Sequence, residues 1–328
     1  MARVQGARLR PPEVTHEDAA HPRREESARR PAPPRARVRV PGRGPMTRDG
    51  RVAIVTGGSR GIGKAVVRSL LESGTKVAFC ARNAQDLRTT AEELASISAD
   101  LLPVQADVTR EGDIDKLVRT TLDRFSQIDI LVNNAGVYGP IGPAWEVDPS
   151  EWRDALTTNL VGAFLMCRAI VPILIGQRRG KVINMSGGGA ATPFARYTAY
   201  AVSKAALVRF TETLALEVAD YNIQVNAIAP GFVATSLHQR TLEAGERAGA
   251  EFLRKTKEEL ERGGVDPAIP AALVAFLASD KADRITGKFI SSVWDDWQNF
   301  EQHVDEIGKT DVYTLRRIVP RDRGMNWK

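Results

Sequence analysis

Cysteine is scarce in this 328-residue chain, which contains only two. Cys80 and Cys167 both lie within apolar runs. Two thiols are too few for a disulfide framework, and their apolar surroundings favour buried thiols over a disulfide or a pair of metal ligands. We therefore expect a reducing compartment, a cytoplasmic location and no metal site. We also identify no apolar run of the ~18 residues that a membrane-spanning helix needs, so we expect no membrane partner.

Aromatic residues are absent from residues 1–45, which are rich in Arg, Pro and Ala. Eleven arginines and five acidic residues in this segment account for the whole formal charge of +6, so residues 46–328 are neutral. A segment of this composition cannot nucleate a core, and we predict a disordered extension before a folded part that begins at Met46. Nucleic-acid binding is the least favoured function, because no aromatic side chains stand between the arginines. We expect no nucleic acid among the partners.

From Arg51 onward, short β-rich runs alternate with longer helical patterns. The expected strands are Val52 to Thr56, Lys76 to Ala81, Leu101 to Ala106, Ile128 to Asn133, Lys181 to Met185, Ile223 to Ala229 and Lys288 to Val293. The expected helices are Gly63 to Ser73, Gln85 to Ser96, Asp113 to Phe125, Pro149 to Ile175, Tyr200 to Ala219 and Pro267 to Leu277. Strict alternation implies a parallel sheet with helices on both faces. The fold class is therefore α/β: one doubly wound Rossmann-type domain over residues 46–293 with a seven-stranded parallel sheet.

Two segments fall outside this alternation. Residues 235–264 contain a charged, helix-compatible stretch that is placed to cover a ligand crevice, and we predict a substrate lid there. Residues 294–328 follow the last strand and contain three of the five tryptophans. Aromatic side chains in such number favour a packed segment over a flexible tail, which is the alternative. We expect Trp294 and Trp297 to be buried and this extension to border the active site or a partner subunit.

A glycine-rich turn joins the first expected strand to the first helix. Glycines permit the tight turn and the close approach of a pyrophosphate, whose charge is met by free amides at the helix N-terminus. The strand-to-helix context makes the pattern much more specific than glycine spacing alone. We therefore predict a dinucleotide site. Its members in this turn are Thr56, Gly57, Ser59, Arg60, Gly61, Ile62 and Gly63.

The second expected strand ends at Arg82, nineteen residues after Gly63. A cofactor without a 2′-phosphate is usually held by an acidic residue at about this position, and none stands here. Arg82 and Arg60, which lies inside the glycine turn, offer guanidinium groups that suit the charge and geometry of a 2′-phosphate. The sequence therefore favours NADP(H) over NAD(H) as the cofactor. The alternative is that both arginines merely face solvent.

Tyr200 and Lys204 stand four residues apart, and Ser186 lies fourteen residues before Tyr200 at the end of an apolar run. Four residues are about one helical turn, so the phenol and the ammonium project from one face. A nearby ammonium favours the phenolate, and we expect it to lower the pKa of Tyr200. A serine hydroxyl could hold a carbonyl or alcohol oxygen while the phenol gives or takes the proton. By itself this spacing is also typical of a solvated helix face, but the glycine turn favours the catalytic interpretation.

Together these motifs resemble the short-chain dehydrogenase/reductase family over about residues 50 to 292. The resemblance rests on pieces that occur in the family's order: Thr56 to Gly63, Asp107-Val108, Asn133-Asn-Ala-Gly136, Asn159, Ser186, Tyr200 with Lys204, and Pro230-Gly231 leading to Thr235. It implies that Tyr200 is the general acid or base and that Ser186 polarises the substrate oxygen. It further implies that Lys204 lowers the Tyr200 pKa and holds the nicotinamide ribose, and that Asn159 kinks its helix and places a water in a proton relay.

The resemblance also implies further cofactor contacts. These are Asp107, Val108, Asn133, Ala135, Gly136, Tyr200, Lys204, Pro230, Gly231, Val233 and Thr235. The chain departs from the family after the last strand, where most members end. Because that strand often forms a subunit interface in the family, the extension puts the usual tetramer in doubt, and we expect a homodimer or homotetramer. A homodimer through the helix that carries Tyr200 is compatible with the extension.

The motifs predict an NADP(H)-dependent oxidoreductase that interconverts a carbonyl and a secondary alcohol by hydride transfer, with a small-molecule substrate. Keto-acyl thioesters, sugars and small ketones all remain open as substrates. The alternative is a cofactor-binding sensor or scaffold without turnover. The presence of all four residues Asn159, Ser186, Tyr200 and Lys204 counts against that alternative.

Overall fold

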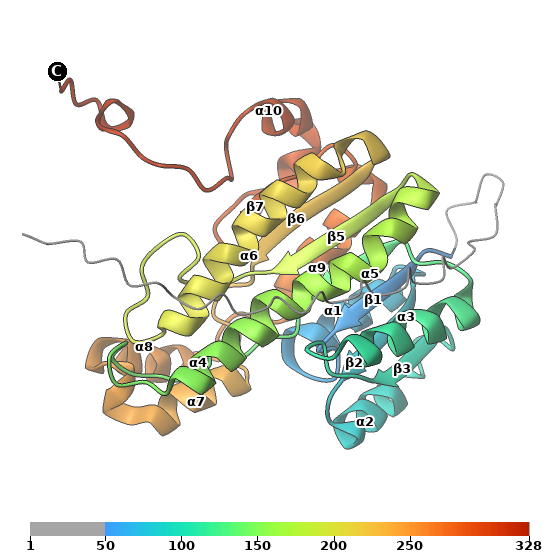
Figure 1. Cartoon of the computed structure of the whole chain (residues 1–328), viewed down its shortest axis with the longest axis horizontal. Helices are drawn as coiled ribbons and strands as arrows, with labels where there is room; N and C mark the ends of the chain where they lie inside the picture. Colours follow the sequence, from blue (N-terminus) through green and yellow to red (C-terminus); the bar gives the residue numbers. More distant parts are fainter. Residues whose placement is uncertain (1–49, 328) are drawn as a thin grey trace, which may run out of the picture. The chain divides into compact units, whose positions relative to one another are not determined.

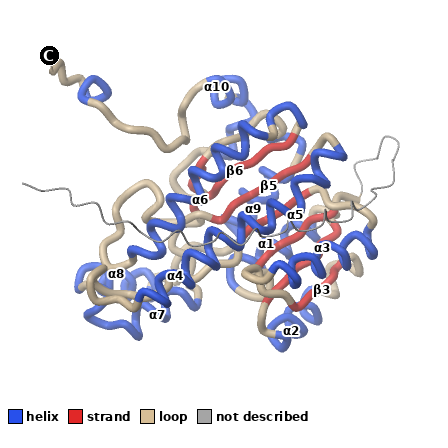
Figure 2. Tube along the Cα trace, in the orientation of Figure 1, coloured by secondary structure: helices blue, strands red, loops and turns tan. Residues whose placement is uncertain are grey.

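The computed structural model describes residues 50–327, and the predicted extension at residues 1–45 lies outside them. Within the described residues, seven strands form one parallel sheet in the order β3-β2-β1-β4-β5-β6-β7 (Figures 1 and 2). The strands are β1 (Val52–Thr56), β2 (Lys76–Ala81), β3 (Leu101–Gln105), β4 (Ile130–Asn133), β5 (Gly180–Met185), β6 (Ile223–Ala229) and β7 (Phe289–Ser291). The strand order reverses beside β1, which pairs with β2 and β4. Open α/β sheets bind ligands at this point, beyond the carboxyl ends of the strands.

Helices cover both faces of the sheet, because the strands alternate apolar side chains between two cores. The α-helices of the described residues are α1 (Gly61–Glu72), α2 (Ala84–Leu94), α3 (Glu111–Phe125), α4 (Pro149–Leu156), α5 (Gly162–Gln177), α6 (Thr198–Glu217), α7 (Ser236–Ala244), α8 (Ala250–Glu261), α9 (Ala268–Ala278) and α10 (Val304–Lys309). Val55 and Phe79 pack with α1, α2 and α9, whereas Ile54 and Ala78 pack with α3, α5 and α6 (Figure 1). This arrangement confirms the predicted doubly wound α/β fold.

The expected strands and helices are all present, and their ends differ from the observed ones by at most two residues. The predicted helix Pro149 to Ile175 is interrupted by a π-helical turn at Thr157–Val161, which separates α4 from α5. Cys80 and Cys167 are free and buried, as expected. Burial raises the pKa of each thiol to about 12.

One expectation about apolar runs is wrong. The helical stretch Pro149–Gln177 is long and apolar enough to cross a membrane by length and composition, with a mean hydropathy of 1.9, and half of its apolar window is buried. Thr157, Thr158, Asn159 and Arg168 interrupt the apolar residues of this stretch, so the sequence shows no continuous apolar run of that length. Met166, Ile170 and Leu174 of α5 are fully buried against the sheet. A mostly buried core helix meets the same criterion, so one such helix is weak evidence for a membrane span.

The C-terminal extension packs on the sheet, in part as expected. Trp297 and Phe300 are 8% and 3% exposed and join the core on the α1 and α9 face. The backbone N–H of Phe289, on the edge strand β7, donates to Tyr313 O at 2.7 Å. The expectation that Trp294 is also buried is wrong, because this side chain is 85% exposed. Trp294 lies in the turn after β7 and, although exposed, lines the crevice of the candidate active site. The extension therefore borders the active site, as expected.

Candidate active site

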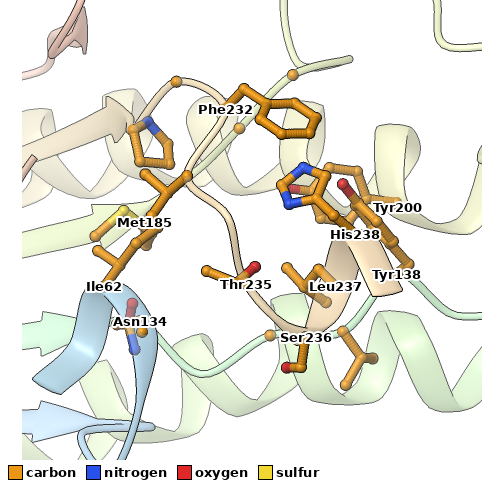
Figure 3. A pocket seen from close by; sticks show the side chains of 18 of the residues that line it. Ile62, Asn134, Tyr138, Met185, Tyr200, Phe232, Thr235, Ser236, Leu237 and His238 are labelled. Atoms are coloured by element: carbon orange, nitrogen blue, oxygen red, sulfur yellow. The ribbon is translucent and has the colours of Figure 1, made fainter. Parts of the chain in front are cut away.

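A crevice of about 1040 Å³ opens beyond the carboxyl ends of the strands, and the lid helices α7 and α8 contribute to its walls (Figure 3). It is lined by these predicted site residues: Arg60, Gly61, Ile62, Gly63, Arg82, Ala135, Gly136, Ser186, Tyr200, Lys204, Pro230, Gly231, Val233 and Thr235. Small-molecule pockets are usually ~300–1,000 Å³, so this crevice is large enough for a dinucleotide and a substrate together. Within residues 50–327 no group of His, Cys, Asp or Glu side chains is placed to hold a metal ion.

The glycine turn has the backbone geometry that a pyrophosphate needs. Gly57 and Gly61 adopt left-handed φ angles of +65° and +52°, which glycine tolerates. A Cβ at Gly63 would stand 2.2 Å from Gly57 O, so only glycine fits there. Helix α1 begins after Arg60 without a side-chain cap, so its first N–H groups are available to an anion. The turn therefore fits the diphosphate of a nicotinamide dinucleotide.

Hydrogen bonds tie this turn to the loop after β4. Thr56 Oγ1 accepts from the backbone N–H groups of Asn134 and Ala135 at 2.9 and 3.0 Å. Asn134 Nδ2 donates to Thr56 O and Gly57 O at 2.9 and 3.1 Å. Through these hydrogen bonds, Thr56 and Gly57 fix the position of the glycine turn relative to the loop after β4. Asn134 belongs to the Asn-Asn-Ala-Gly motif that the sequence places at the cofactor site, although it was not named among the individual cofactor contacts.

Asn133 takes a different place from the one expected. Its side chain is 4% exposed, and its Nδ2 donates to Asn184 Oδ1 on β5 at 2.9 Å. Successive residues at a strand end point in opposite directions, so Asn133 is directed into the core and Asn134 toward the crevice. The structure therefore assigns Asn133 to the sheet interior.

All charged side chains that line the crevice are cationic. They are Arg60, Arg82, Lys204 and Arg240, and no acidic residue of the described chain lines it. Arg60 and Arg82 are both exposed. The crevice therefore offers a positive potential to a phosphorylated ligand.

Asp107, Val108 and Ser59 are not among the residues that line the crevice. Burial raises the pKa of Asp107, but hydrogen bonds from Thr109 and the nearby charges of Arg82 and Arg110 outweigh it, so the net shift is downward. Asp107 is therefore ionised at neutral pH. Val108 packs against Gly162, and the backbone oxygen of Ser59 accepts from Thr90 Oγ1 at 2.7 Å. Cofactor contacts by these three residues stay predictions.

Tyr200 lies in the first turn of α6 and is 8% exposed. Its ring makes an edge contact with Tyr138, with centroids 4.8 Å apart. A Cβ at Gly187 would stand only 2.3 Å from the Tyr200 hydroxyl, so this glycine, which sequence reasoning missed, lets the phenol reach the strand end. The side chain faces the crevice (Figure 3).

Burial raises the pKa of Tyr200, which is opposite to the lowering expected from Lys204. The Lys204 ammonium lies 5.5 Å from the Tyr200 ring centroid and donates to Met185 O at 2.7 Å. It therefore sits over the ring and is held by a carbonyl instead of the phenol oxygen. Burial also lowers the pKa of Lys204 to about 8, because its charge is removed from water.

Asn159 occupies the π-helical turn between α4 and α5 and is 1% exposed. Its Oδ1 accepts from Val137 N and its Nδ2 donates to Val137 O, both at 2.8 Å. Nδ2 also donates to Ser203 Oγ on α6 at 2.9 Å. A π turn locally changes the direction of a helix, so the sequence-based expectation of a kink at Asn159 matches this geometry.

Ser186 follows β5 directly and is 1% exposed. Its hydroxyl donates to the backbone oxygen of Lys204 at 3.2 Å. The contact holds the strand end against the helix that carries Tyr200. Ser186, Tyr200 and Lys204 thus line the same crevice from β5 and α6, as the spacing predicted.

Aromatic side chains form the wall opposite the glycine turn. Phe194 stacks on Tyr197 with centroids 4.3 Å apart, and Phe252 of α8 makes an edge contact with Phe194 at 4.8 Å. His238 of α7 and Tyr138 complete this wall (Figure 3). Sequence reasoning predicted a lid at residues 235–264 but missed Tyr138 and Phe194, which come from outside it.

Comparisons with known proteins agree with this geometry. A model of the short chain dehydrogenase family matches residues 51–246. The chain is 36% identical to L-fucose dehydrogenase of Rattus norvegicus over 232 residues, which are 70% of this chain and 84% of that protein. It is 34% identical to the 3-oxoacyl-acyl-carrier-protein reductase FabG of Chlamydia pneumoniae over 243 residues, which are 74% of this chain and 95% of that protein.

Solved structures are also similar. An actinorhodin polyketide ketoreductase variant solved with NADPH superposes with a TM-score of 0.69 at 30% identity, over 75% of this chain and 96% of that chain. Xylitol dehydrogenase with bound NAD+ superposes with a TM-score of 0.70 at 28% identity, over 74% of this chain and 97% of that chain. The chain therefore belongs to the short-chain dehydrogenase/reductase family and is an NAD(P)-dependent oxidoreductase.

Proposed function

We propose that the protein is an NADP(H)-dependent oxidoreductase that interconverts a carbonyl and a secondary alcohol, with Tyr200 as the acid and base. One observation carries the proposal: Ser186, Tyr200 and Lys204 line a crevice whose other end is a glycine turn shaped for a pyrophosphate. When bound, NADPH supplies the hydride that reduces the substrate carbon and becomes NADP+. The protein supplies the proton and the orientation.

In the reducing direction, the Tyr200 hydroxyl donates its proton to the substrate oxygen. The Ser186 hydroxyl donates a hydrogen bond to the same oxygen. Lys204, with a pKa lowered to about 8, is mostly protonated at pH 7 and stabilises the phenolate that remains. Asn159, which is anchored to Val137 and Ser203, positions a water that returns the proton. General acid catalysis of this kind contributes ~10²- to 10⁴-fold to the rate.

The preference for NADP(H) is supported by the charge of the crevice. Arg60 lies in the glycine turn and Arg82 follows β2, and no acidic side chain of the described residues lines the crevice. A ribose 2′-phosphate would be stabilised by guanidinium groups at this position, whereas ribose hydroxyls are usually held by an acidic residue. The relative solved with NADPH and the relative solved with NAD+ show that the fold alone does not decide this choice.

A homodimer through α5 and α6 is part of the proposal. Phe164 on α5 and Val202 on α6 are each 47% exposed, and Phe164 contacts Phe210 of α6. Exposed apolar side chains on neighbouring helices mark contact surfaces. The edge of β7 is already bonded to the extension through Tyr313, which supports a dimer over a tetramer. Light scattering after size-exclusion chromatography measures the mass of the assembly and so distinguishes a monomer, a dimer and a tetramer.

We also propose a cytoplasmic location, supported by the two free thiols.

A steady-state screen tests the proposed function. NADPH and NADH oxidation should be measured in parallel over aldehydes, ketones, keto-esters, acyl thioesters and sugars, with NADP+ and NAD+ reduction over the matching alcohols. We expect turnover of at least one carbonyl, faster with NADPH. Tight NADPH binding without turnover of any substrate would favour the sensor or scaffold alternative. Faster turnover with NADH would contradict the cofactor assignment.

A further inference from the structure

The substrate wall of the crevice contains a histidine whose polar atoms the proposed chemistry does not use. His238, on the lid helix α7, is 7% exposed and lines the crevice. Its ring lies against Phe232 with centroids 3.8 Å apart and makes an edge contact with Tyr138 at 6.0 Å. Figure 3 shows this imidazole facing the space bordered by Met185, Thr235 and Tyr200. It therefore stands beside the place where the reacting oxygen must lie.

The imidazole is incompletely hydrogen-bonded. His238 Nδ1 is buried and has no hydrogen-bond partner among the described residues. Burial lowers the pKa of His238 to about 4, and a hydrogen bond to the backbone of Val233 opposes this shift only in part. The ring is therefore neutral at pH 7 and has one N–H donor and one acceptor nitrogen. Buried polar groups in folded proteins are nearly always paired, and an unpaired one is destabilising. A ligand that fills the crevice can supply the missing partner.

The rest of this wall favours a cyclic apolar molecule. Tyr138, Phe194, Tyr200 and Phe252 form a cluster of rings in mutual contact. Aromatic faces bind planar or cyclic apolar groups well, whereas an open-chain sugar has a hydroxyl on nearly every carbon and would leave several of them unpaired against such a wall. A polar group that borders this ring cluster, as the His238 imidazole does at Tyr138, favours a ligand oxygen at a fixed position.

We propose that His238 is the specificity-determining residue of the substrate site, and that it hydrogen-bonds a second oxygen of a cyclic ketone whose carbonyl reacts at Tyr200. The proposal rests on the proposed function and narrows its substrate class. The second oxygen is a hydroxyl or carbonyl on the ring, and it stays unchanged in the reaction. The reacting carbon takes the hydride from NADPH, and its oxygen takes the Tyr200 proton, so NADP+ and the ring alcohol are the products.

The test compares matched ketones with and without a second oxygen. Wild-type protein, His238→Phe and His238→Asn are assayed with NADPH and cyclohexanone, 2-hydroxycyclohexanone, 4-hydroxycyclohexanone and cyclohexane-1,4-dione. We expect kcat/KM for the best oxygenated ketone to exceed that for cyclohexanone by about 10-fold. His238→Phe keeps the ring contact with Phe232 and should abolish this preference by raising KM for the oxygenated ketones more than KM for cyclohexanone. His238→Asn should retain part of the preference for the oxygenated ketone, because asparagine still offers hydrogen-bonding groups.

His303 provides the control, because it is an exposed histidine in the extension, just before α10, and its ring pairs with Glu306 of that helix. His303→Phe should leave the preference intact. NADPH affinity and the melting temperature report whether His238→Phe is folded. If its preference for the oxygenated ketone survives, or if the wild type does not distinguish the ketones, the assignment of His238 is overturned.

The two proposals fail in different ways. If the wild type reduces open-chain sugars or thioesters but none of the four cyclic ketones, the substrate class is wrong and the proposed function stands. If none of the tested carbonyl compounds supports NADPH oxidation, the proposed function fails together with the inference. If His238→Phe lowers kcat equally for all ketones, the residue has a structural role only, and the inference is also overturned.

Discussion

The two walls of the crevice are built in different ways. The cofactor wall consists mainly of backbone: Gly57, Gly61 and Gly63 shape a turn whose amides face the crevice. The substrate wall consists of side chains from separate segments, such as Tyr138 after β4 and Phe252 in the lid. A backbone site needs particular residues at fixed spacing, whereas a side-chain wall needs only apolar groups of the right size. The cofactor wall is therefore visible in the sequence, and the substrate wall is not.

This difference predicts separate consequences for mutations on each side. Changes in the substrate wall and at Tyr200 should affect turnover and KM while NADPH affinity is retained. Changes in the glycine turn and at Arg82 should affect NADPH affinity first. Measuring NADPH affinity by fluorescence titration alongside kcat/KM separates the two classes.

The largest effect is expected for Tyr200→Phe, which removes the proton donor and keeps the ring that packs on Tyr138. Turnover should fall at least ~10²-fold, as for a lost general acid. NADPH affinity should change little, because the hydroxyl faces the substrate. A variant that keeps more than about a tenth of wild-type turnover would show that another group supplies the proton.

Gly187→Ala tests the substrate wall without removing a functional group. The new Cβ would stand 2.3 Å from the Tyr200 hydroxyl and displace it. Overpacking of this kind is destabilising by ~1–3 kcal/mol, which corresponds to about 5- to 160-fold when it falls on the reacting geometry, so kcat should drop by that factor. Gly188→Ala is the matched control, since nothing lies within 4 Å of its new Cβ. Equal effects of the two variants would argue against the assigned position of the phenol.

Gly63→Ala tests the cofactor wall in the same way. Its Cβ would stand 2.2 Å from Gly57 O, a backbone atom that cannot rotate aside. We expect NADPH affinity to fall about 5- to 160-fold from a similar ~1–3 kcal/mol of strain, whereas Gly112→Ala, on open helix surface, should bind normally. Normal NADPH affinity in Gly63→Ala would mean that the pyrophosphate does not approach this turn.

The smallest effect is expected for Arg82→Asp, because Arg82 is exposed and its interaction with a 2′-phosphate is partly screened by solvent. NADPH affinity should fall about 10-fold, as for one lost charge-assisted hydrogen bond, and NADH use should improve. The ratio of kcat/KM for the two cofactors measures the change. An unaltered ratio would leave Arg60 as the residue that selects the cofactor.

Most of the fold followed from the sequence because its signals are local. Each strand is a continuous apolar run and each crossover helix has its own periodic pattern, so their ends were predicted to within two residues. The glycine turn and the pair Tyr200 and Lys204 are short-range patterns of the same kind. The π turn at Asn159 followed only from the family resemblance, because nothing in the spacing of its neighbours indicates it.

Burial and charge in the site were decided by tertiary contacts. Trp297 enters the core while Trp294, three residues earlier, is exposed, because the turn after β7 sets their directions. Asn133 points into the sheet and Asn134 into the crevice. The pKa of Tyr200 is raised by surrounding apolar groups, although Lys204 lies one helical turn away. The spacing of residues in the sequence shows which side chains can lie close together. How deeply these side chains are buried depends on packing by segments that are far apart in the chain.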